Sequence, residues 1–220
     1  MKKSKLFSLI TASLFLLFII FTLLVKLVGV QPARQLGSEI GFASLNEKIF
    51  SKLGVNQTMY GVTEKLGLIT FLIIGAFVVL GLVQLIKGKS LKKVDYKIWA
   101  LGGFYVVVLA FYVLFEIIVI NYRPILIENK LEASYPSSHT VLSICVVSSA
   151  MIVLKDMLNS KPLKITAFIV GAVLMAVMVV GRLLSGVHWF TDILGGIILS
   201  LALVSLFYTT ILILKDKLCK

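Results

Sequence analysis

Six long runs of this chain contain no Asp, Glu, Lys or Arg, and apolar side chains dominate each of them. About 20 apolar residues in a helix are enough to cross the roughly 30 Å hydrocarbon core of a bilayer. The two shortest runs reach that length once flanking residues such as His139 and Leu163 are included. The six runs are 6–25, 66–86, 98–115, 140–154, 165–181 and 193–214. They predict an all-α, polytopic integral membrane protein with six transmembrane helices, folded as a single domain over residues 1–220.

The composition agrees with a membrane location and excludes other classes of protein. Hydrophobic residues make up 59% of the 220 residues and charged residues 15%, more apolar than a soluble globule of this size. The net charge of +12 comes from basic residues in short clusters between the apolar runs, and these clusters do not form one stripe on a soluble surface. The expected partner is therefore the bilayer with its anionic lipids, and no nucleic acid is expected.

The basic residues are unevenly divided between the two sides that six spans create. The two termini and the connections 87–97 and 155–164 hold 14 basic residues against three acidic ones, whereas the other side holds eight basic and seven acidic residues. The basic residues of the first side are Lys2, Lys3, Lys5, Lys87, Lys89, Lys92, Lys93, Lys97, Lys155, Lys161, Lys164, Lys215, Lys217 and Lys220. The positive-inside rule predicts a multi-pass protein of the cell membrane with both termini in the cytoplasm.

The longest connection on the outer side, residues 31–65, contains a short helical pattern. Apolar residues recur at helical spacing within residues 43–53, with charged residues between them. The apolar positions are Leu45, Ile49, Phe50 and Leu53. They predict a short amphipathic helix on the outer leaflet, which serves as a lid or packing element or, alternatively, as an element through which lipid reaches the protein.

The histidines and arginines are the residues that indicate a functional site. Both histidines, His139 and His188, fall at outer ends of the last four predicted spans, as do two of the three arginines, Arg123 and Arg182. A single Arg or His at the end of a membrane helix usually anchors that helix. Two of each on one side, together with Asp192, are more consistent with a shared site.

His188 and Asp192 are four residues apart at the start of the last span, so they share one face of a helix. The carboxylate can then accept a hydrogen bond from one ring nitrogen and leave the other nitrogen able to attack, as nucleophilic catalysis requires. Asp192 also suits a helix start for a simpler reason, because a negative charge there is favoured by about 0.3–1 kcal/mol. The two roles are compatible.

The segment from Pro136 to His139 leads into the fourth span, where the unsatisfied amide hydrogens of a helix amino terminus suit an anion. Ser137 is a candidate to donate its hydroxyl, the amides of Ser138 and His139 to bind oxygens, and the His139 ring to pass a proton to a leaving group. The same segment also fits an ordinary serine N-cap.

Arg123 and Arg182 favour an anionic substrate. Their planar guanidinium groups suit phosphoryl oxygens, whose charge must be stabilised in an in-line transition state. Metal catalysis is not expected, because the two His and one Asp have no further outer carboxylate at ligand-like spacing. No cofactor is predicted.

Together these residues resemble the type 2 phosphatidic acid phosphatase superfamily, which includes bacterial membrane lipid phosphatases. That family's pattern is a lysine, six residues and Arg-Pro, then Pro-Ser-Gly-His, then Ser-Arg, five residues, His, three residues and Asp. The matching residues are Arg123, Pro124, Pro136, Ser137, His139, Arg182, His188 and Asp192. Ser138 stands where the family has glycine, and Gly181 where it has serine. The motifs lie within residues 116–196.

The resemblance implies a mechanism. His188 is expected to attack phosphorus and form a phosphohistidine while Asp192 holds its tautomer, and His139 is expected to act first as an acid and then as a base. The expected phosphate ligands are Arg123, Arg182, Ser137 and Ser138.

One position departs from the family pattern. Glu116 stands seven residues before Arg123, where the family carries its phosphate-binding lysine. Three explanations are open: Glu116 pairs with Arg123 and positions it, Glu116 contacts a cationic part of the substrate, or Lys130 supplies the missing positive charge. The first is favoured, because seven residues on a helix return to nearly the same face. Tyr122, beside Arg123, is a further candidate for contact with substrate or for support of the site.

A site at the outer boundary of the membrane lets a lipid keep its chains in the bilayer while its phosphate is hydrolysed. The expected substrate is a lipid phosphate, with undecaprenyl diphosphate, phosphatidylglycerol phosphate and phosphatidic acid as candidates. One rival interpretation is a small transporter or channel subunit with an anion-binding arginine cluster, although transporters tend to place polar residues near mid-membrane, where these spans are apolar. The other is a vanadate-dependent oxidase, whose relatives share the motifs but are soluble.

Overall fold

The computed structural model describes residues 3–34 and 37–218 of the chain. Among them are six helices long and apolar enough to span a membrane, and each contains one of the predicted runs, which confirms the predicted all-α architecture. The helices are α1 (Lys3–Leu27), α3 (Gln57–Gly88), α4 (Tyr96–Ile117), α5 (Ser138–Met157), α6 (Lys161–Leu184) and α7 (Phe190–Leu218), with a 3₁₀ helix η1 (Leu91–Lys93) between α3 and α4. Lys2 and Lys220, which the charge count includes, lie outside the described residues.

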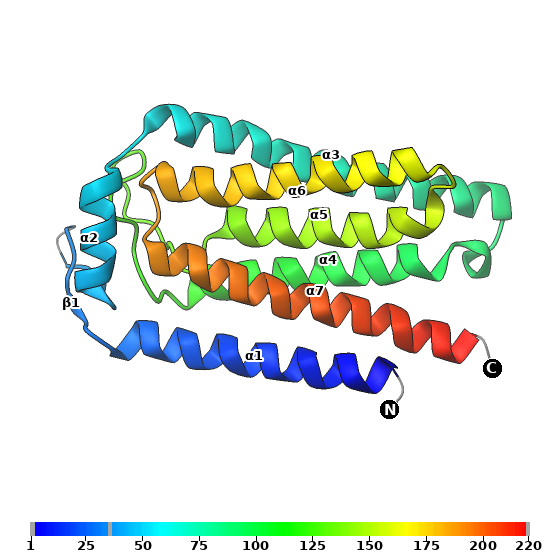
Figure 1. Cartoon of the computed structure of the whole chain (residues 1–220), viewed down its shortest axis with the longest axis horizontal. Helices are drawn as coiled ribbons and strands as arrows, with labels where there is room; N and C mark the ends of the chain where they lie inside the picture. The colour runs from blue at the N-terminus through cyan, green and yellow to red at the C-terminus, as the bar shows by residue number, and fades with distance from the viewer. Residues whose placement is uncertain (1–2, 35–36, 219–220) are drawn as a thin grey trace.

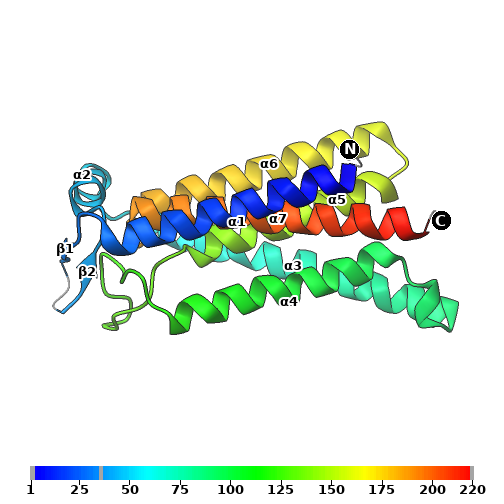
Figure 2. The ribbon, with the colours of Figure 1, turned by 90° about the horizontal axis from the view of Figure 1, so that it is seen from below.

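The start of α1 and the end of α7 lie at one end of the bundle, and the short elements between α1 and α3 gather at the other end (Figure 1). There α2 (Ala43–Leu53) crosses the ends of the long helices beside a small antiparallel sheet. The sheet consists of β1 (Gln31–Pro32) and β2 (Glu39–Ile40), with Gln31 opposite Ile40. This end of the bundle is called the α2 end below. The view from below shows the same separation along the length of the bundle (Figure 2).

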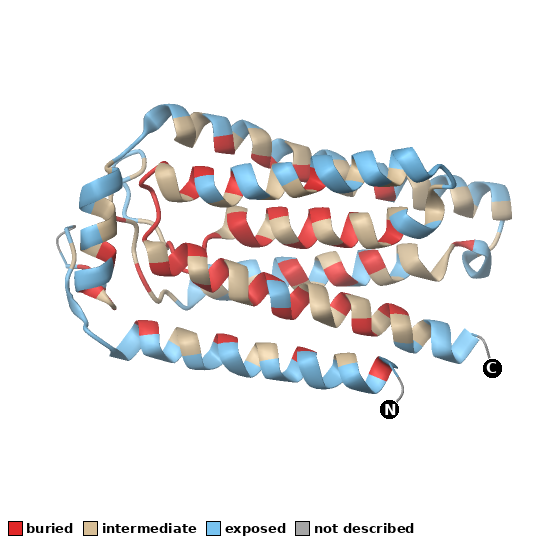
Figure 3. Ribbon diagram, in the orientation of Figure 1, coloured by how far each residue is buried: buried red, intermediate tan, exposed pale blue. Residues whose placement is uncertain are grey.

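Helices α5 and α7 form the centre of the bundle. Half of the most apolar part of α5 is buried within the protein, against 11% for α6, and Figure 3 shows the buried residues concentrated on α5 and the first turns of α7. Small residues such as Ser143 and Cys145 are buried in α5 and let neighbouring helices approach closely. The outer helices instead expose apolar side chains such as Leu72 and Ile117, as surfaces that face lipid chains do.

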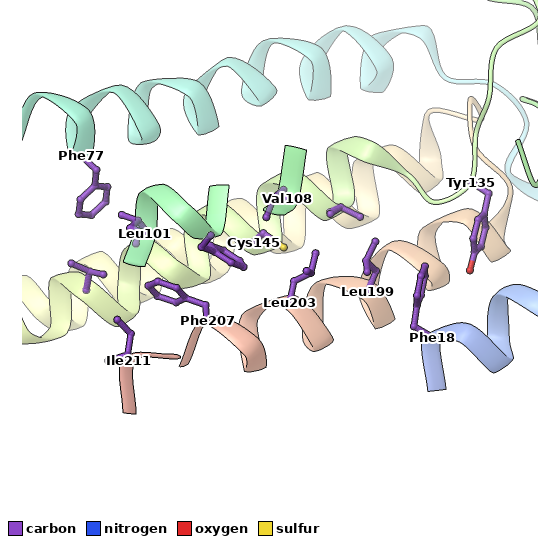
Figure 4. Packing of buried hydrophobic residues seen from close by; sticks show 14 of the residues in the cluster. Phe18, Phe77, Leu101, Val108, Tyr135, Cys145, Leu199, Leu203, Phe207 and Ile211 are labelled. Carbon is purple, nitrogen blue, oxygen red and sulfur yellow. The ribbon is translucent and has the colours of Figure 1, made fainter. Parts of the chain in front are cut away.

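Aromatic packing fixes the segment that enters α5. Tyr135 is buried and stacks on Phe18 of α1 with ring centroids 6.4 Å apart, and its hydroxyl lies 2.8 Å from that of Thr22. Gly195 of α7 leaves room for the Tyr135 ring, because a Cβ at this position would overlap with it. Figure 4 shows Tyr135 and Phe18 at one end of an apolar cluster that continues along α7 to Ile211.

Helix α3 begins at Gln57, well before its predicted apolar run. Asn56 is the N-cap, and its side-chain oxygen accepts a hydrogen bond from a backbone N–H in the first turn at 3.0 Å. Residues 57–65 thereby extend the helix by about 13 Å, at 1.5 Å per residue. The extension brings Glu64 to the α2 end, where the sequence alone indicates only a connecting segment.

Helix α2 has the predicted bounds, and part of its predicted apolar stripe packs against the protein, because Phe50 contacts the buried Trp189. Ala43 and Asn46 are buried, whereas Leu45 and Leu53 of the predicted apolar stripe are 41% and 40% exposed. Asn46 points inward because it finds hydrogen-bond partners on α7. The hydrogen bonds of Asn46 and the packing of Phe50 together determine how this helix is turned.

Candidate active site

Three segments that are far apart in the chain meet at the α2 end. They are the connection between α4 and α5, the first turn of α5, and the loop that joins α6 to α7. The backbone N–H of Ser137 donates to the carbonyl of Asp192 at 3.0 Å, and the indole N–H of Trp189 donates to the carbonyl of Tyr122 at 2.8 Å. These bonds join all three segments, so that His139 and His188 line the same cavity.

The connection between α4 and α5 folds back on itself as a short antiparallel ladder. The backbone N–H of Arg123 donates to the carbonyl of Glu132 at 3.1 Å, and the N–H of Ser134 donates to that of Asn121 at 2.9 Å. The ladder places the Arg123 and Glu132 side chains next to each other and Asn121 beside Asp192. Backbone pairing thus determines which charged groups meet in the site.

His188 is 3% exposed, and both of its ring nitrogens have partners. Nδ1 lies 3.1 Å from the carbonyl oxygen of Ser134. Because a carbonyl can only accept, Nδ1 carries the hydrogen and Nε2 keeps its lone pair. Nε2 accepts a hydrogen bond from Nη2 of Arg182 at 3.2 Å. The ring is therefore in the tautomer that attack through Nε2 requires.

Asp192 does not hold His188 in the way that the four-residue spacing predicts. Its Oδ2 is 3.9 Å from Nδ1 of His188, too far for a hydrogen bond. The fully buried carboxylate instead accepts from the side-chain amide of Asn121 at 3.0 Å and from the backbone N–H of Trp189 at 2.8 Å. The second bond is the reach-back contact of a helix start. The Ser134 carbonyl sets the tautomer, and Asp192 stabilises the loop beside it.

Arg182 is completely buried, and a residue that the sequence analysis missed balances its charge. Nη1 lies 2.8 Å from Oε1 of Glu64 and 3.4 Å from Oγ1 of Thr63, both on the extension of α3. The ring of Tyr60 lies 5.5 Å from the guanidinium carbon. Since Nη2 contacts His188, the guanidinium group bridges the Glu64 carboxylate and the His188 ring.

His139 lies in the first turn of α5 with its side chain 24% exposed. Its Nε2 is 3.6 Å from Oε2 of Glu64, so one carboxylate contacts both Arg182 and His139. Gly67, one turn after Glu64, leaves room for the ring, because a Cβ there would approach Nε2 of His139 to 3.2 Å. Helix α3 thus forms one wall of the site.

The favoured pairing of Glu116 with Arg123 is wrong. Nε of Arg123 lies 3.1 Å from Oε2 of Glu132. Helix α4 ends at Ile117, so the seven-residue helical repeat that would bring Glu116 to Arg123 does not continue far enough. Glu116 is exposed and lines the cavity, Lys130 is exposed in the turn of the connection, and neither forms an ion pair with another described residue.

The remaining predicted residues lie close by. Ser137 is the N-cap of α5, but its buried side chain makes no capping bond. Its Oγ accepts a hydrogen bond from the Thr140 hydroxyl at 3.1 Å. Because Ser137 is the acceptor in this bond, its own hydroxyl hydrogen can be donated to another group. Ser138 lines the cavity beside His139. Tyr122 supports the loop through its carbonyl, which accepts the bond from Trp189.

Several buried side-chain nitrogen atoms around the two histidines have no hydrogen-bond partner among residues 3–34 and 37–218. They are Nε of Arg182, Nη1 of Arg123, Nδ1 of His139 and also Nε of Arg123, whose 3.1 Å contact with Glu132 is an ion pair without hydrogen-bond geometry. Buried polar groups in proteins are nearly always satisfied. A set of guanidinium and imidazole donors of this kind suits an anion with several acceptor oxygens.

A cavity of about 600 Å³ runs from the two histidines between α3, α4 and α5. Its walls are mostly apolar and include Phe71 of α3, Leu109 of α4 and Leu142 of α5, while its polar groups include Glu116 and the histidines. Because these walls belong to membrane-spanning helices, the cavity suits a ligand with an apolar chain and an anionic head.

The environment of His188 keeps its ring neutral. Burial lowers the pKa of His188 well below its ordinary value, and the positive charges of Arg123 and Arg182 lower it further. The bond to the Ser134 carbonyl raises the pKa but does not offset the other effects. A neutral imidazole at neutral pH is the form that can act as a nucleophile.

Helix α2 holds the loop that carries His188. Asn46 is completely buried, its Nδ2 donates to the Thr191 hydroxyl at 2.9 Å, and its Oδ1 accepts from the Thr191 N–H at 3.2 Å. Trp189 is buried against Ala43 and lies 5.5 Å from Phe50, centroid to centroid. The residues on the carboxyl side of His188 are therefore held by α2, which packs on them through Phe50 of its apolar stripe and bonds to them through Asn46.

Comparison with known proteins identifies the fold and the family of this chain. The crystal structure of a transmembrane PAP2-type phosphatidylglycerolphosphate phosphatase from Bacillus subtilis matches with a TM-score of 0.61 and 22% sequence identity. The match covers 90% of this chain and 94% of that chain, so the two share a fold. Among curated proteins there was no match. A model of the PAP2 superfamily matches residues 100–215, more than half of the chain and all three motif segments. The resemblance found in the sequence is confirmed, and the chain belongs to the PAP2 superfamily.

Proposed function

We propose that this protein is a membrane lipid phosphatase that hydrolyses a phosphate monoester or diphosphate of a lipid. The observation that carries the proposal is His188, whose Nε2 lone pair faces the buried Arg182 guanidinium at the polar part of an apolar cavity. Membership of the PAP2 superfamily supports a phosphatase, and the cavity between membrane-spanning helices supports a lipid as the substrate.

In the first step, Nε2 of His188 attacks phosphorus in line with the bond to the lipid oxygen. A phosphorus–nitrogen bond forms, the phosphorus–oxygen bond breaks, and His139 gives its proton to the departing oxygen. In the second step, His139 takes a proton from water, the water oxygen attacks phosphorus, and the bond to His188 breaks. Inorganic phosphate and the dephosphorylated lipid are the products.

The arginines and the amino terminus of α5 stabilise the negative charge on the phosphoryl oxygens in the transition state. Arg123 and Arg182 contact the equatorial oxygens through their guanidinium groups. Nε of Arg182 and Nη1 of Arg123 have no hydrogen-bond partner among the described residues, whereas Nη1 and Nη2 of Arg182 exchange their partners for the phosphoryl oxygens. The Ser137 hydroxyl and the amide near Ser138 add neutral donors at the helix amino terminus. Asp192 acts indirectly, by holding the Trp189 backbone and thus the loop on which His188 stands.

The site faces outward in this proposal. The two described termini lie at the end opposite α2, and the excess of lysines at that end assigns it to the cytoplasm by the positive-inside rule. The α2 end is then extracytoplasmic, where a lipid headgroup can reach His188 while its chains lie in the apolar cavity.

The candidate substrates are undecaprenyl diphosphate, phosphatidylglycerol phosphate and phosphatidic acid. The solved relative is described as a phosphatidylglycerolphosphate phosphatase, which makes that lipid one member of the panel. Glu116 at the cavity wall has no cation paired with it among the described residues, so lipids with and without an amine in the headgroup belong in the panel too. If wild-type protein prefers the lipid with an amine and Glu116→Gln loses that preference, Glu116 contacts the cationic headgroup.

The proposal is tested with protein purified in detergent and a panel of monophosphate and diphosphate lipids, with released phosphate as the readout. Wild-type protein is expected to release phosphate from at least one lipid, and a chelator is expected to leave the rate unchanged. No release from any lipid of the panel would favour the rival interpretation, a non-catalytic transporter or channel subunit.

The pH dependence of the reaction follows from the environment of His188. Because the folded-state pKa of this ring is lowered, the neutral nucleophile persists as the pH falls through about 6.5, the ordinary value for histidine. The acid limb of kcat/KM is therefore expected below pH 6.5. The profile is corrected for the measured titration of the substrate phosphate, whose second pKa is also about 6. An acid limb that stays at or above pH 6.5 after that correction would contradict a neutral buried nucleophile.

Replacing Asn46 is expected to affect both stability and activity. Asn46→Ala leaves the Thr191 N–H and hydroxyl without their partner, at a cost of about 1–3 kcal/mol of unfolding free energy, and it loosens the loop of His188. We expect a lower temperature of unfolding in detergent and a fall in kcat of about tenfold. Ser51→Ala on the exposed side of α2 is the matched control and should change neither quantity. A fall in stability with kcat unchanged would limit α2 to a structural role.

A further inference from the structure

Glu64 contacts the two groups that the proposed function assigns to the phosphoryl group and the leaving oxygen. One carboxylate oxygen lies 2.8 Å from Nη1 of Arg182, and the other lies 3.6 Å from Nε2 of His139. A phosphoryl group bound to Arg182, with its leaving oxygen at His139, would use the same donors. Glu64 therefore competes with the substrate for them.

The nucleophile is part of the same arrangement. Arg182 donates from Nη2 to the lone pair on Nε2 of His188, which is the pair that must attack phosphorus. The guanidinium is held in this position from the other side by the Glu64 carboxylate and by Thr63. Before reaction, Arg182 must turn its N–H groups from these partners to the phosphoryl oxygens.

The two partners of the ion pair differ in how readily they can move. The Arg182 side chain is 0% exposed, while the Glu64 side chain is 41% exposed on a helix at the rim of the site. A carboxylate can leave a guanidinium when another anion takes its place, because both bind the same planar donors. Glu64 can return to water, whereas Arg182 cannot.

We infer that Glu64 is an internal competitor of the phosphoryl group: it holds Arg182 and His139 in a self-paired arrangement that substrate must displace. The inference rests on the proposed function, because it concerns phosphate binding at the same site. Glu64 is thus a positioning residue whose charge weakens anion binding. In the absence of substrate it also keeps the completely buried Arg182 paired, since an unpaired buried charge is strongly destabilising.

The test is Glu64→Gln, which keeps the size of the side chain and a carbonyl oxygen for Arg182 but removes the negative charge. We expect binding of inorganic phosphate and of orthovanadate to tighten by about tenfold and KM for the lipid to fall by a similar factor, with kcat changed less than about twofold. Glu128→Gln is the matched control, because it removes the same charge from an exposed residue of the connection between α4 and α5. It should change none of these constants.

Two outcomes would overturn the inference. Unchanged or weaker phosphate binding in Glu64→Gln would show that the carboxylate does not compete with an anion. A fall in kcat with KM unchanged would instead show that Glu64 assists His139. Should Glu64→Gln fail to fold, Glu64→Asp retains the charge but withdraws it by one methylene, and it should tighten phosphate binding by a smaller factor; unchanged or weaker binding in that variant would overturn the inference as well.

Phosphate binding is measured directly by titration calorimetry, so this test does not depend on turnover. If wild-type protein hydrolyses a lipid phosphate but Glu64→Gln binds inorganic phosphate no more tightly, only the inference fails. If no lipid is hydrolysed, the proposed function fails, and the calorimetric comparison still reports whether Glu64 competes with an anion at Arg182.

Discussion

His188→Ala is expected to lower kcat/KM for every lipid phosphate by about 10⁴-fold or more. The expectation follows from the lone pair on Nε2, which the Ser134 carbonyl exposes by fixing the hydrogen on Nδ1. Neither of the charged side chains next to the ring can replace it: the Arg182 guanidinium has no basic lone pair, and the Asp192 carboxylate is 3.9 Å from the ring and completely buried. The measurement is phosphate release at saturating and at low lipid concentration.

Because His188 is buried and bonded to Ser134 and Arg182, the fold of this variant must be checked independently. His188→Gln, which retains hydrogen-bonding capacity, serves that purpose, and the temperature of unfolding in detergent is compared for all variants. Rapid quenching in alkali should trap a phosphorylated wild-type protein that loses its label in acid, as phosphohistidine does. Residual activity within tenfold of wild type in a folded variant would rule out His188 as the nucleophile.

The second large effect is expected for His139→Ala, and it should depend on the leaving group. With a lipid alkoxide as the leaving group, loss of the acid is expected to lower kcat/KM by about 10²–10⁴-fold. An aryl phosphate such as p-nitrophenyl phosphate needs no proton on its leaving oxygen, so the same variant should form the phosphohistidine at nearly the wild-type rate. Hydrolysis of that intermediate still lacks its base, and the expected result is a burst of p-nitrophenol followed by slow turnover.

Wild-type protein and His188→Ala are the two controls for this experiment, since neither should show the burst followed by slow turnover. Equal losses on the lipid and on the aryl phosphate, without a burst, would mean that His139 serves to bind phosphate and transfers no proton. The contact of His139 with Glu64 makes the comparison informative in the Glu64→Gln background as well. There, tighter phosphate binding without a change in the leaving-group dependence would separate the two residues' roles.

The membrane helices and the motif residues could be predicted from the sequence because their causes are local. A run of apolar residues long enough to cross the bilayer becomes a helix whatever its neighbours are, and the observed helices contain all six runs. The family motifs place Arg123, His139 and His188 at the ends of three such segments.

The partners of these residues could not be predicted, because they come from elsewhere in the chain. Glu64 reaches Arg182 only because α3 continues upstream of its apolar run to the Asn56 cap. The cap was the available signal, since an Asn before a polar but helix-compatible stretch marks a helix start. Because Glu64 is charged, the predicted apolar run begins after it, and its segment is predicted to be a connection between spans.

Glu116 illustrates the opposite error. Helical spacing over seven residues predicted its pairing with Arg123, but α4 ends at Ile117 and the chain turns into a backbone ladder that brings Glu132 to Arg123 instead. Spacing rules apply only while the element continues, and the end of a helix depends on the tertiary contacts of the segment that follows.

The sequence by itself determined that this chain has six helices able to cross a bilayer, which ends of these helices are basic, and that it carries motif residues of the PAP2 superfamily. These are properties of single segments and of their side chains. Only the tertiary structure decided that a backbone carbonyl sets the tautomer of His188, that α2 clamps the loop beside it through Asn46, and that Glu64 occupies Arg182. Each of these features depends on the distance between segments that are far apart in the chain. That distance is set by how the helices pack and cannot be read from the order of the residues.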